Sequence, residues 1–164
     1  MDKEKPKLIF EQFLLIPEKI HLINKLGKKC SKEIIYWLAG EIVKIFEKEK
    51  YNEDYDLTMV WIDNIMHINY GYSDASLFLI IILRELLLAK SEANKDDVLE
   101  ILNEFMTKYK YPVFRRLMIY VVNKDWTKYR ETFWKLVEND KDYILFNRDK
   151  YSNDLYYLFS NNSD

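Results

Sequence analysis

Hydrophobic residues recur at steps of three and four along most of the chain, which is the spacing of one face of an α-helix. The pattern is clearest between Asn94, which can cap a helix, and Tyr109. The inward side of this helix would comprise Val98, Ile101, Leu102, Phe105 and Met106. Ser31 and Asp125 can cap two further helices in the same way, over about residues 34–46 and 126–137. These three segments predict amphipathic helices with one buried side each.

Proline and glycine mark two other helices. Pro17 and Gly27 bracket a short one, since proline suits the first turn of a helix and glycine the position after its end. Its inward side would be formed by Ile20, Ile23 and Leu26. Pro112 suits the first turn of a helix that continues to about Val121.

Weaker patterns predict four more helices. They are Leu8–Leu15, a helix capped by Asp56 that contains Val60, Trp61, Ile65 and Ile68, a helix from Ser73 or Asp74 to about Ala89, and a last one from Ser152 through Phe159. The total is about eight or nine helices and no strand. Because the connections are short and polar, we expect an all-α fold in which sequential helices form antiparallel hairpins.

The second half of the chain contains a weak internal echo. Leu83–Lys90 and Leu117–Lys124 are each followed by a capped amphipathic helix, at offsets of 34 residues for the first helices and 31 for the second. Two-helix solenoid repeats have periods in this range. The pattern is compatible with a HEAT- or TPR-like α-solenoid segment and with a compact helical bundle.

Composition narrows the class of protein. The 164 residues form one expected domain, 1–164, and three Gly and three Pro argue against a sheet protein with many tight turns. Lys and Arg number 25 and Asp and Glu 27, so the net charge of −2 argues against nucleic acid as a partner and gives no general attraction to anionic membranes. The apolar run from Leu77 is too short to span a bilayer, and no signal peptide is predicted. The single Cys30 indicates a reducing, cytoplasmic location.

The residues that could carry acid-base, metal or thiol chemistry are few. His21 and His67 are the only histidines and are 46 positions apart, and one Glu18-x-x-His21 match does not make a di-metal site. His67 has apolar neighbours and is interpreted as a structural histidine rather than a catalytic base. Cys30 lies near a helix start that could lower a thiol pKa, but without a partner constellation it is interpreted as an ordinary, partly exposed cysteine. We therefore expect no enzyme activity, cofactor or metal.

Arg115 and Arg116 form the most notable polar pair. Two guanidinium groups in the first turn of a mainly buried helix can bind a phosphate or an acidic partner. The alternative is that one arginine pairs with a neighbouring helix through Glu85 or Asp97 while the other is solvated.

Acidic and aromatic clusters have plain explanations. The carboxylates of Glu41–Asp56 alternate with lysines at helical spacing, as on a solvated face. Aromatic residues mixed with basic ones at Trp126–Arg130 could stack on single-stranded nucleic acid, but aromatic packing between helices accounts for most of them.

One segment resembles a known family. Lys110–Tyr120 has the Pro-x-x-Arg pattern of HEAT-like repeats, and the likeness extends over about residues 77–158, from Arg84-Glu85 to Phe133-Trp134-Lys135-Leu136-Val137. This region is similar to the helical repeats of large bacterial STAND-type and related antiphage ATPases. The resemblance implies a sensor or scaffold without chemistry of its own, and either a piece of a larger protein or a stand-alone relative. No phosphate-binding Gly-x-x-x-x-Gly-Lys-Ser/Thr loop is present, so the ATPase part is absent.

Three functions remain open. The first is a non-catalytic module that binds another protein or another part of its own assembly, as in bacterial antiviral defence. The second is a small helical enzyme or ligand-binding protein that uses His67 or Arg115 in an interhelical pocket. The third is a nucleic-acid-contacting domain, which requires Arg115, Arg116, Lys128 and Arg130 to share an exposed face.

Overall fold

The computed structural model describes residues 17–52, 54–56, 58, 65, 75–140 and 143–162. Within these residues the chain forms seven α-helices and one 3-10 turn, and its only β-type pairing is an isolated bridge between Asn52 and Tyr55. The helices are α2 (Pro17–Lys29), α3 (Lys32–Lys48), α5 (Ala75–Ala93), α6 (Lys95–Thr107), α7 (Pro112–Lys124), α8 (Trp126–Asn139) and α9 (Arg148–Asn161), and the turn is η2 (Ile144–Phe146). The prediction of an all-α fold is confirmed.

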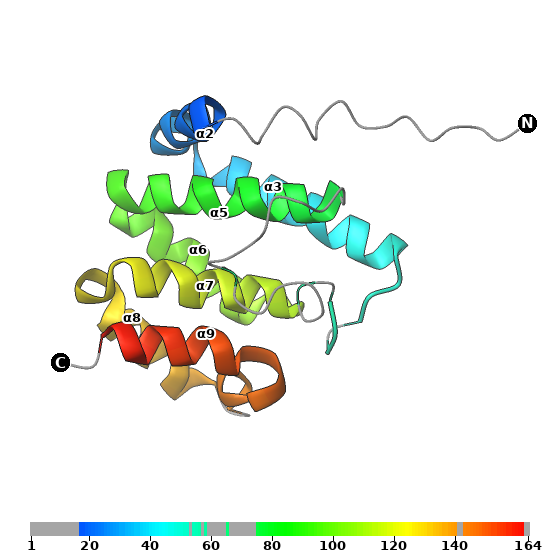
Figure 1. Cartoon of the computed structure of the whole chain (residues 1–164), viewed down its shortest axis with the longest axis vertical. Coiled ribbons are helices and arrows are strands. Elements are labelled where there is room, and N and C mark those ends of the chain that lie inside the picture. Colours follow the sequence, from blue (N-terminus) through cyan, green and yellow to red (C-terminus); the bar gives the residue numbers. More distant parts are fainter. Residues whose placement is uncertain are drawn as a thin grey trace, which may run out of the picture.

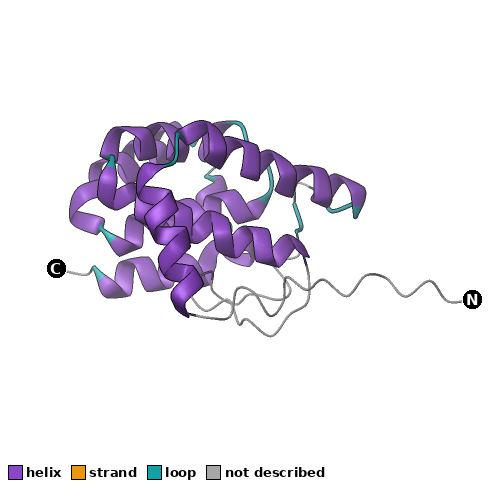
Figure 2. Cartoon of the chain, turned by 90° about the horizontal axis from the view of Figure 1, so that it is seen from above, coloured by secondary structure: helices purple, strands orange, loops and turns teal. Residues whose placement is uncertain are grey.

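The helices lie in layers along the longest axis of the molecule (Figure 1). The α2 helix lies at the top, α5 and α3 below it, α6 and α7 in the middle, and α8 and α9 at the bottom. The α5 helix packs against α2, α3, α6 and α7, and α7 packs against α8 and α9. The view from above shows the same described elements as helices joined by short loops (Figure 2).

The helix caps of the second half form as predicted. The side-chain oxygen of Asn94 accepts a hydrogen bond from the Asp97 amide at 3.1 Å, and that of Asp125 accepts one from the Lys128 amide at 3.2 Å. Pro112 occupies the first turn of α7. Each of these caps is a contact between residues close in sequence, which is why the sequence pattern located them.

The last helix begins earlier than predicted. It starts at Arg148 rather than Ser152, because Asn147 accepts a hydrogen bond from the Asp149 amide at 3.0 Å and so caps the helix one turn sooner. The α5 helix likewise continues to Ala93, past the predicted end at Ala89.

The prediction that Gly27 ends the first described helix is wrong. The helix continues to Lys29, and Gly27 lies inside it against α5. A Cβ atom at Gly27 would lie 2.7 Å from the Cβ of Ala89, closer than two carbons can approach, so glycine is needed for the packing distance of the two helices. Because this side of α2 faces α5, Leu26 points outward and is 54% exposed, contrary to the prediction.

The hydrophobic core runs through all layers. Its largest fully buried aromatic side chains are Phe46, Phe105, Phe114, Phe133, Tyr129 and Tyr151. The predicted helix Leu8–Leu15 lies outside the described residues, and of the one capped by Asp56 only residues 56, 58 and 65 are described.

Candidate functional site

Arg116 lies inside the molecule. The residue is only 2% exposed, its Nε donates to Oδ2 of Asp154 at 2.6 Å, and its Nη1 donates to the carbonyl oxygen of Thr58 at 2.5 Å. The guanidinium therefore joins α7 to α9 and to the backbone of residue 58. In this position it cannot reach an external phosphate or acidic partner.

Arg84 extends this contact into an arginine cluster, which we define as Arg84, Arg116 and Asp154. The other oxygen of Asp154 accepts a hydrogen bond from the Ile65 amide at 3.2 Å. Arg84 donates to the Ile65 carbonyl at 3.1 Å and to Glu85 through Nε at 2.9 Å and Nη2 at 2.6 Å. The cluster thus holds the backbone of Thr58 and Ile65 by charge-assisted hydrogen bonds.

Asp56 has a similar structural role. Its two carboxylate oxygens accept hydrogen bonds from the Thr58 amide at 2.9 Å and the Val113 amide at 2.7 Å, and also from the Thr58 hydroxyl. The bond to Val113 satisfies an amide in the first turn of α7. Burial raises the pKa of Asp56, and also that of Asp154, while hydrogen bonds and the nearby Arg116 act in the opposite direction.

Arg115 is held by backbone carbonyls. Its Nη1 donates to the Lys110 oxygen at 3.2 Å and its Nη2 to the Met106 oxygen at 3.3 Å, so the side chain covers the C-terminal end of α6. Burial raises the pKa of the neighbouring Tyr151 to about 12, against the opposing effect of Arg115. Arg115 is half-buried, and its contact with an external anion remains a prediction.

The expected ion-pair partners of the arginine pair are wrong. Glu85 pairs with Arg84, and Asp97 pairs with Lys90 at 2.8 Å. Asp154 is far from Arg116 in the sequence, and its sequence neighbours include several tyrosines. No local pattern therefore indicated that it is the ion-pair partner of Arg116.

Lys90 of α5 and Cys30, the residue that follows α2, form a second buried polar contact. The Lys90 amine donates to the Cys30 carbonyl at 2.7 Å. Cys30 is 4% exposed, so the expectation of a partly exposed cysteine is wrong. Burial raises its thiol pKa, which argues against a reactive thiolate and leaves the structural interpretation.

A polar cleft of about 360 Å³ lies between α2 and α5. It is lined by His21, Asn24, Lys25, Lys28, Glu85, Leu88, Ala89 and Glu92. Lys28 and Glu92 form an ion pair across it at 2.7 Å. His21 is exposed there, while His67 lies outside the described residues. Among the residues that the structure describes, no group of three or more His, Cys, Asp or Glu side chains could hold a metal ion.

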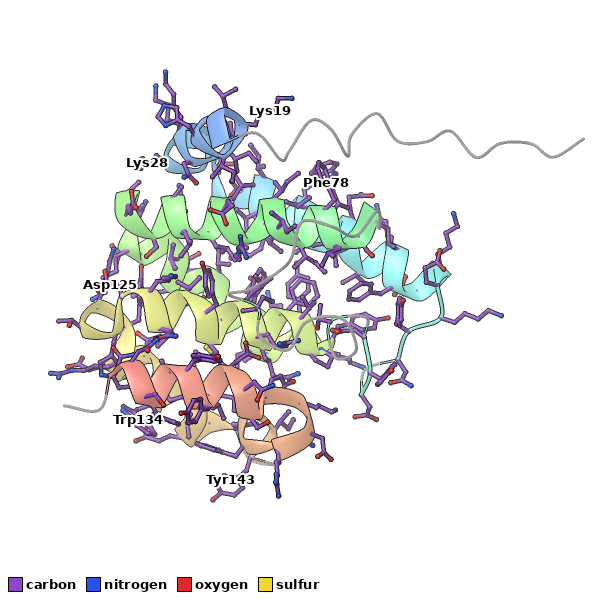
Figure 3. The ribbon with its side chains drawn as sticks, in the orientation of Figure 1. Lys19, Lys28, Phe78, Asp125, Trp134 and Tyr143 are labelled. Carbon is purple, nitrogen blue, oxygen red and sulfur yellow. The ribbon has the colours of Figure 1, made fainter. Side chains whose placement is uncertain are left out.

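Large apolar side chains are exposed at the two ends of the layered fold. On α2 and α3 these are Leu22, Leu26, Ile34 and Trp37, with exposed fractions from 42% to 64%. At the other end are Trp134, Tyr143, Phe146, Phe159 and Tyr156. Figure 3 shows Lys19 and Lys28 on α2 at one end, and Trp134 and Tyr143 at the opposite end. The sequence analysis did not predict that these residues are exposed. The occurrence of Leu22 and Leu26 in a lysine-rich helix could have indicated it.

The lower end has a defined aromatic arrangement. The rings of Trp134 and Phe159 are stacked at 6.2 Å with an interplanar angle of 22°, and Trp126 contacts Trp134 edge-on. Tyr143 is 70% exposed and has a left-handed backbone conformation with φ 51°, which is unfavourable for a bulky residue. We call Trp134, Tyr143, Phe146 and Phe159 the aromatic surface.

The comparisons with known proteins give no relative. No family model, no curated protein and no solved structure matches this chain. Among the described residues, no helix has the length and apolar character needed to cross a membrane.

Proposed function

We propose that this protein is a non-catalytic helical module that binds another protein, or another part of its own assembly, through the exposed ends of its helical layers. The observation that carries the proposal is the exposure of large apolar side chains on the outer helices, in contrast to the buried hydrophobic cluster that the described helices share. Exposed apolar residues that gather on one part of a surface are typical of interaction sites.

The arrangement of helices supports the same proposal. Helices α5 and α6 are joined by one residue, as are α7 and α8, and the corresponding helices α5 and α7, and α6 and α8, are in contact. This is the neighbour relation of two-helix repeats, which present extended surfaces to partners. A sensor or scaffold role in bacterial antiviral defence belongs to the proposal through the resemblance of residues 77–158.

The positions of Arg116 and Lys128 argue against the nucleic-acid hypothesis in its original form. Arg116 is buried and Lys128 donates to the Ser91 carbonyl, so Arg115, Arg116, Lys128 and Arg130 do not present four free cations on one exposed face. A ligand-binding function would use the cleft between α2 and α5, which His21, Lys25 and Glu85 line. Native mass spectrometry of the purified chain tests that second function, since a bound small molecule should be lost in a Lys25→Ala/Lys28→Ala variant.

Site-specific photo-crosslinking tests the proposed function. A photoreactive amino acid replaces Trp37 at one end or Trp134 at the other, in cells that naturally contain the chain. We expect a discrete crosslinked protein from at least one of these positions and none from Asn103, which is exposed on α6 and serves as the control. The absence of a protein crosslink at both ends would overturn the proposal.

A further inference from the structure

The α2 helix concentrates positive charge in an acidic chain. It contains four lysines and one glutamate, a net charge of +3 with His21 neutral, whereas the whole chain carries −2. The remaining residues therefore carry −5. A local charge opposite in sign to that of the chain attracts a partner with complementary charge and orients it.

Leucines and lysines share one exposed side of α2. Leu22, Lys25, Leu26 and Lys29 occupy positions i, i+3, i+4 and i+7, which form one stripe along a helix. All four are exposed, with Leu22 61% and Leu26 54% exposed. We call these four residues the outer stripe. The opposite side of α2 is occupied, because Gly27 packs against Ala89 of α5.

The spacing of the residues in the outer stripe fits the contact face of one partner helix. Two leucines one turn apart form the spacing that receives the apolar side chains of a single amphipathic helix, and two lysines one turn apart lie beside them. A partner helix could contact Leu22, Leu26, Lys25 and Lys29 without changing how α2 packs on α5, because these four side chains are already exposed.

Other occupants fit less well. A flat anionic membrane would attract the lysines of α2 but repel the rest of the chain, which has a net charge of −5. A second copy that packed α2 on α2 about a two-fold axis would bring together two helices that each have a net charge of +3. Nucleic acid would gain nothing from Leu22 and Leu26, since leucine side chains neither stack on bases nor form hydrogen bonds with them.

We propose that the outer stripe is the docking site for an acidic amphipathic helix of a protein partner, with apolar residues spaced one turn apart and Asp or Glu beside them. This inference rests on the proposed function and adds the chemistry of the partner. The apolar side chains contact Leu22 and Leu26, and the carboxylates pair with Lys25 and Lys29.

Selection from a displayed library of random peptides of about 16 residues, with the full chain as bait, tests the inference. We expect enriched peptides that combine apolar residues at i, i+4 spacing with flanking Asp or Glu. Their affinity should fall about tenfold or more for Lys25→Glu/Lys29→Glu and for Leu22→Ser/Leu26→Ser. Circular dichroism confirms that each variant is folded, which is expected because the altered side chains are exposed.

A matched control separates a local contact from the total charge. Lys44→Glu/Lys48→Glu makes the same charge change at the same spacing on α3 and should leave peptide binding unchanged. A peptide with Lys in place of its Glu residues should in turn prefer the Lys25→Glu/Lys29→Glu variant over the wild type.

Several results would overturn the inference. They are the absence of enriched peptides, enriched peptides that lack acidic residues, and binding that is equal in the stripe variants. Stripe-dependent binding of phosphatidylserine vesicles or of a single-stranded oligonucleotide would overturn it as well. Crosslinks at Trp134 with none at Trp37, together with enriched peptides that depend on the aromatic surface, would overturn this inference and leave the proposed function intact.

Discussion

The α2 helix and the interior between α7 and α9 use charged side chains in opposite ways. In the interior, Arg116 and Asp154 are almost fully buried, and their hydrogen-bonding groups bind each other and the backbone of residues 58 and 65. On α2, Lys25 and Lys29 are exposed beside two exposed leucines. The interior charges hold the fold together, whereas Lys25 and Lys29 are exposed, and we propose that they pair with a partner. A pair of adjacent arginines in the sequence is thus not by itself a marker of an exposed surface.

The largest effect should come from the interior. Arg116→Ala leaves the carboxylate of Asp154 buried without its partner, and we expect it to lower the free energy of unfolding by about 3–5 kcal/mol. Urea denaturation followed by circular dichroism measures this change. The double variant Arg116→Met/Asp154→Leu removes both charges and should recover part of the loss, because the Thr58 carbonyl and the Ile65 amide still lose these hydrogen bonds. A loss below about 1 kcal/mol in the single variant would show that the ion pair does not hold α9 in place.

The packing of α2 against α5 can be tested by replacing glycine with alanine at two positions. Gly27→Ala introduces a Cβ atom that would meet Ala89 at 2.7 Å, and we expect a net loss of about 1–2 kcal/mol after the gain in helix propensity. Gly40→Ala in α3 places its Cβ where no other atom lies within 4 Å, and should stabilise the protein by up to about 1 kcal/mol. Thermal denaturation of the two variants gives the comparison. Equal stabilisation by both would contradict the close contact of α2 with α5.

The pH dependence of stability tests the burial of Asp56. Its ordinary pKa is 3.8 and burial raises it, so the folded chain binds a proton that the unfolded chain has released. The contribution of this group to stability is therefore complete below pH 3.8 and is lost as the pH rises through the folded-state pKa, by at most about 1.4 kcal/mol per pH unit.

The variant Asp56→Asn isolates this effect, since asparagine stays neutral. We expect its cost relative to the wild type to be larger at pH 4 than at pH 7 in urea denaturation, because only the wild type loses stability as the pH rises. A cost that is larger at pH 7 would mean that the donors from Thr58 and Val113, with Arg116, favour the ionised carboxylate more than burial disfavours it.

The smallest effect on stability should come from the outer stripe. Leu22→Ser and Leu26→Ser remove side chains that are 61% and 54% exposed, and each should change the free energy of unfolding by no more than about 0.5 kcal/mol. By contrast, the same substitution at the fully buried Leu117 should be severely destabilising. A large loss of stability on substitution of Leu22 would mean that this residue belongs to the core. It would then not be part of a docking surface.

The local features of the fold could be predicted from the sequence. The caps at Asn94 and Asp125 and the start of α7 at Pro112 depend on residues within one turn, so periodicity and propensity located them. The end of α2 could not be predicted. Glycine is both a common stop signal and a means of close helix packing, and only the position of Ala89 on another helix distinguishes the two at Gly27.

The contents of the site were predictable to a smaller extent. Arg115 and Arg116 were visible as unusual residues in a buried helix, but their partners depend on tertiary contacts. Asp154 was one of many acidic residues, and its pairing with Arg116 is set by how α9 packs on α7. Leu26 was predicted to point inward, and Leu22 was not assigned to either side of α2. In a short helix with many lysines, the hydrophobic pattern does not identify one buried side.

The arginine cluster also sets the order in which the chain can complete its fold during synthesis. Asp154 follows Arg116 by 38 residues and Ile65 by 89. At about 5–20 residues per second, a ribosome adds those 38 residues in roughly 2–8 s. Throughout that interval Arg116 has no carboxylate from α9, and contacts of such long sequence separation form late. The helix pair α2 and α5, in contrast, is fully synthesised before α7 begins. These helices can therefore pack together on the growing chain, whereas the contacts between α7 and α9 can form only after α9 has been synthesised.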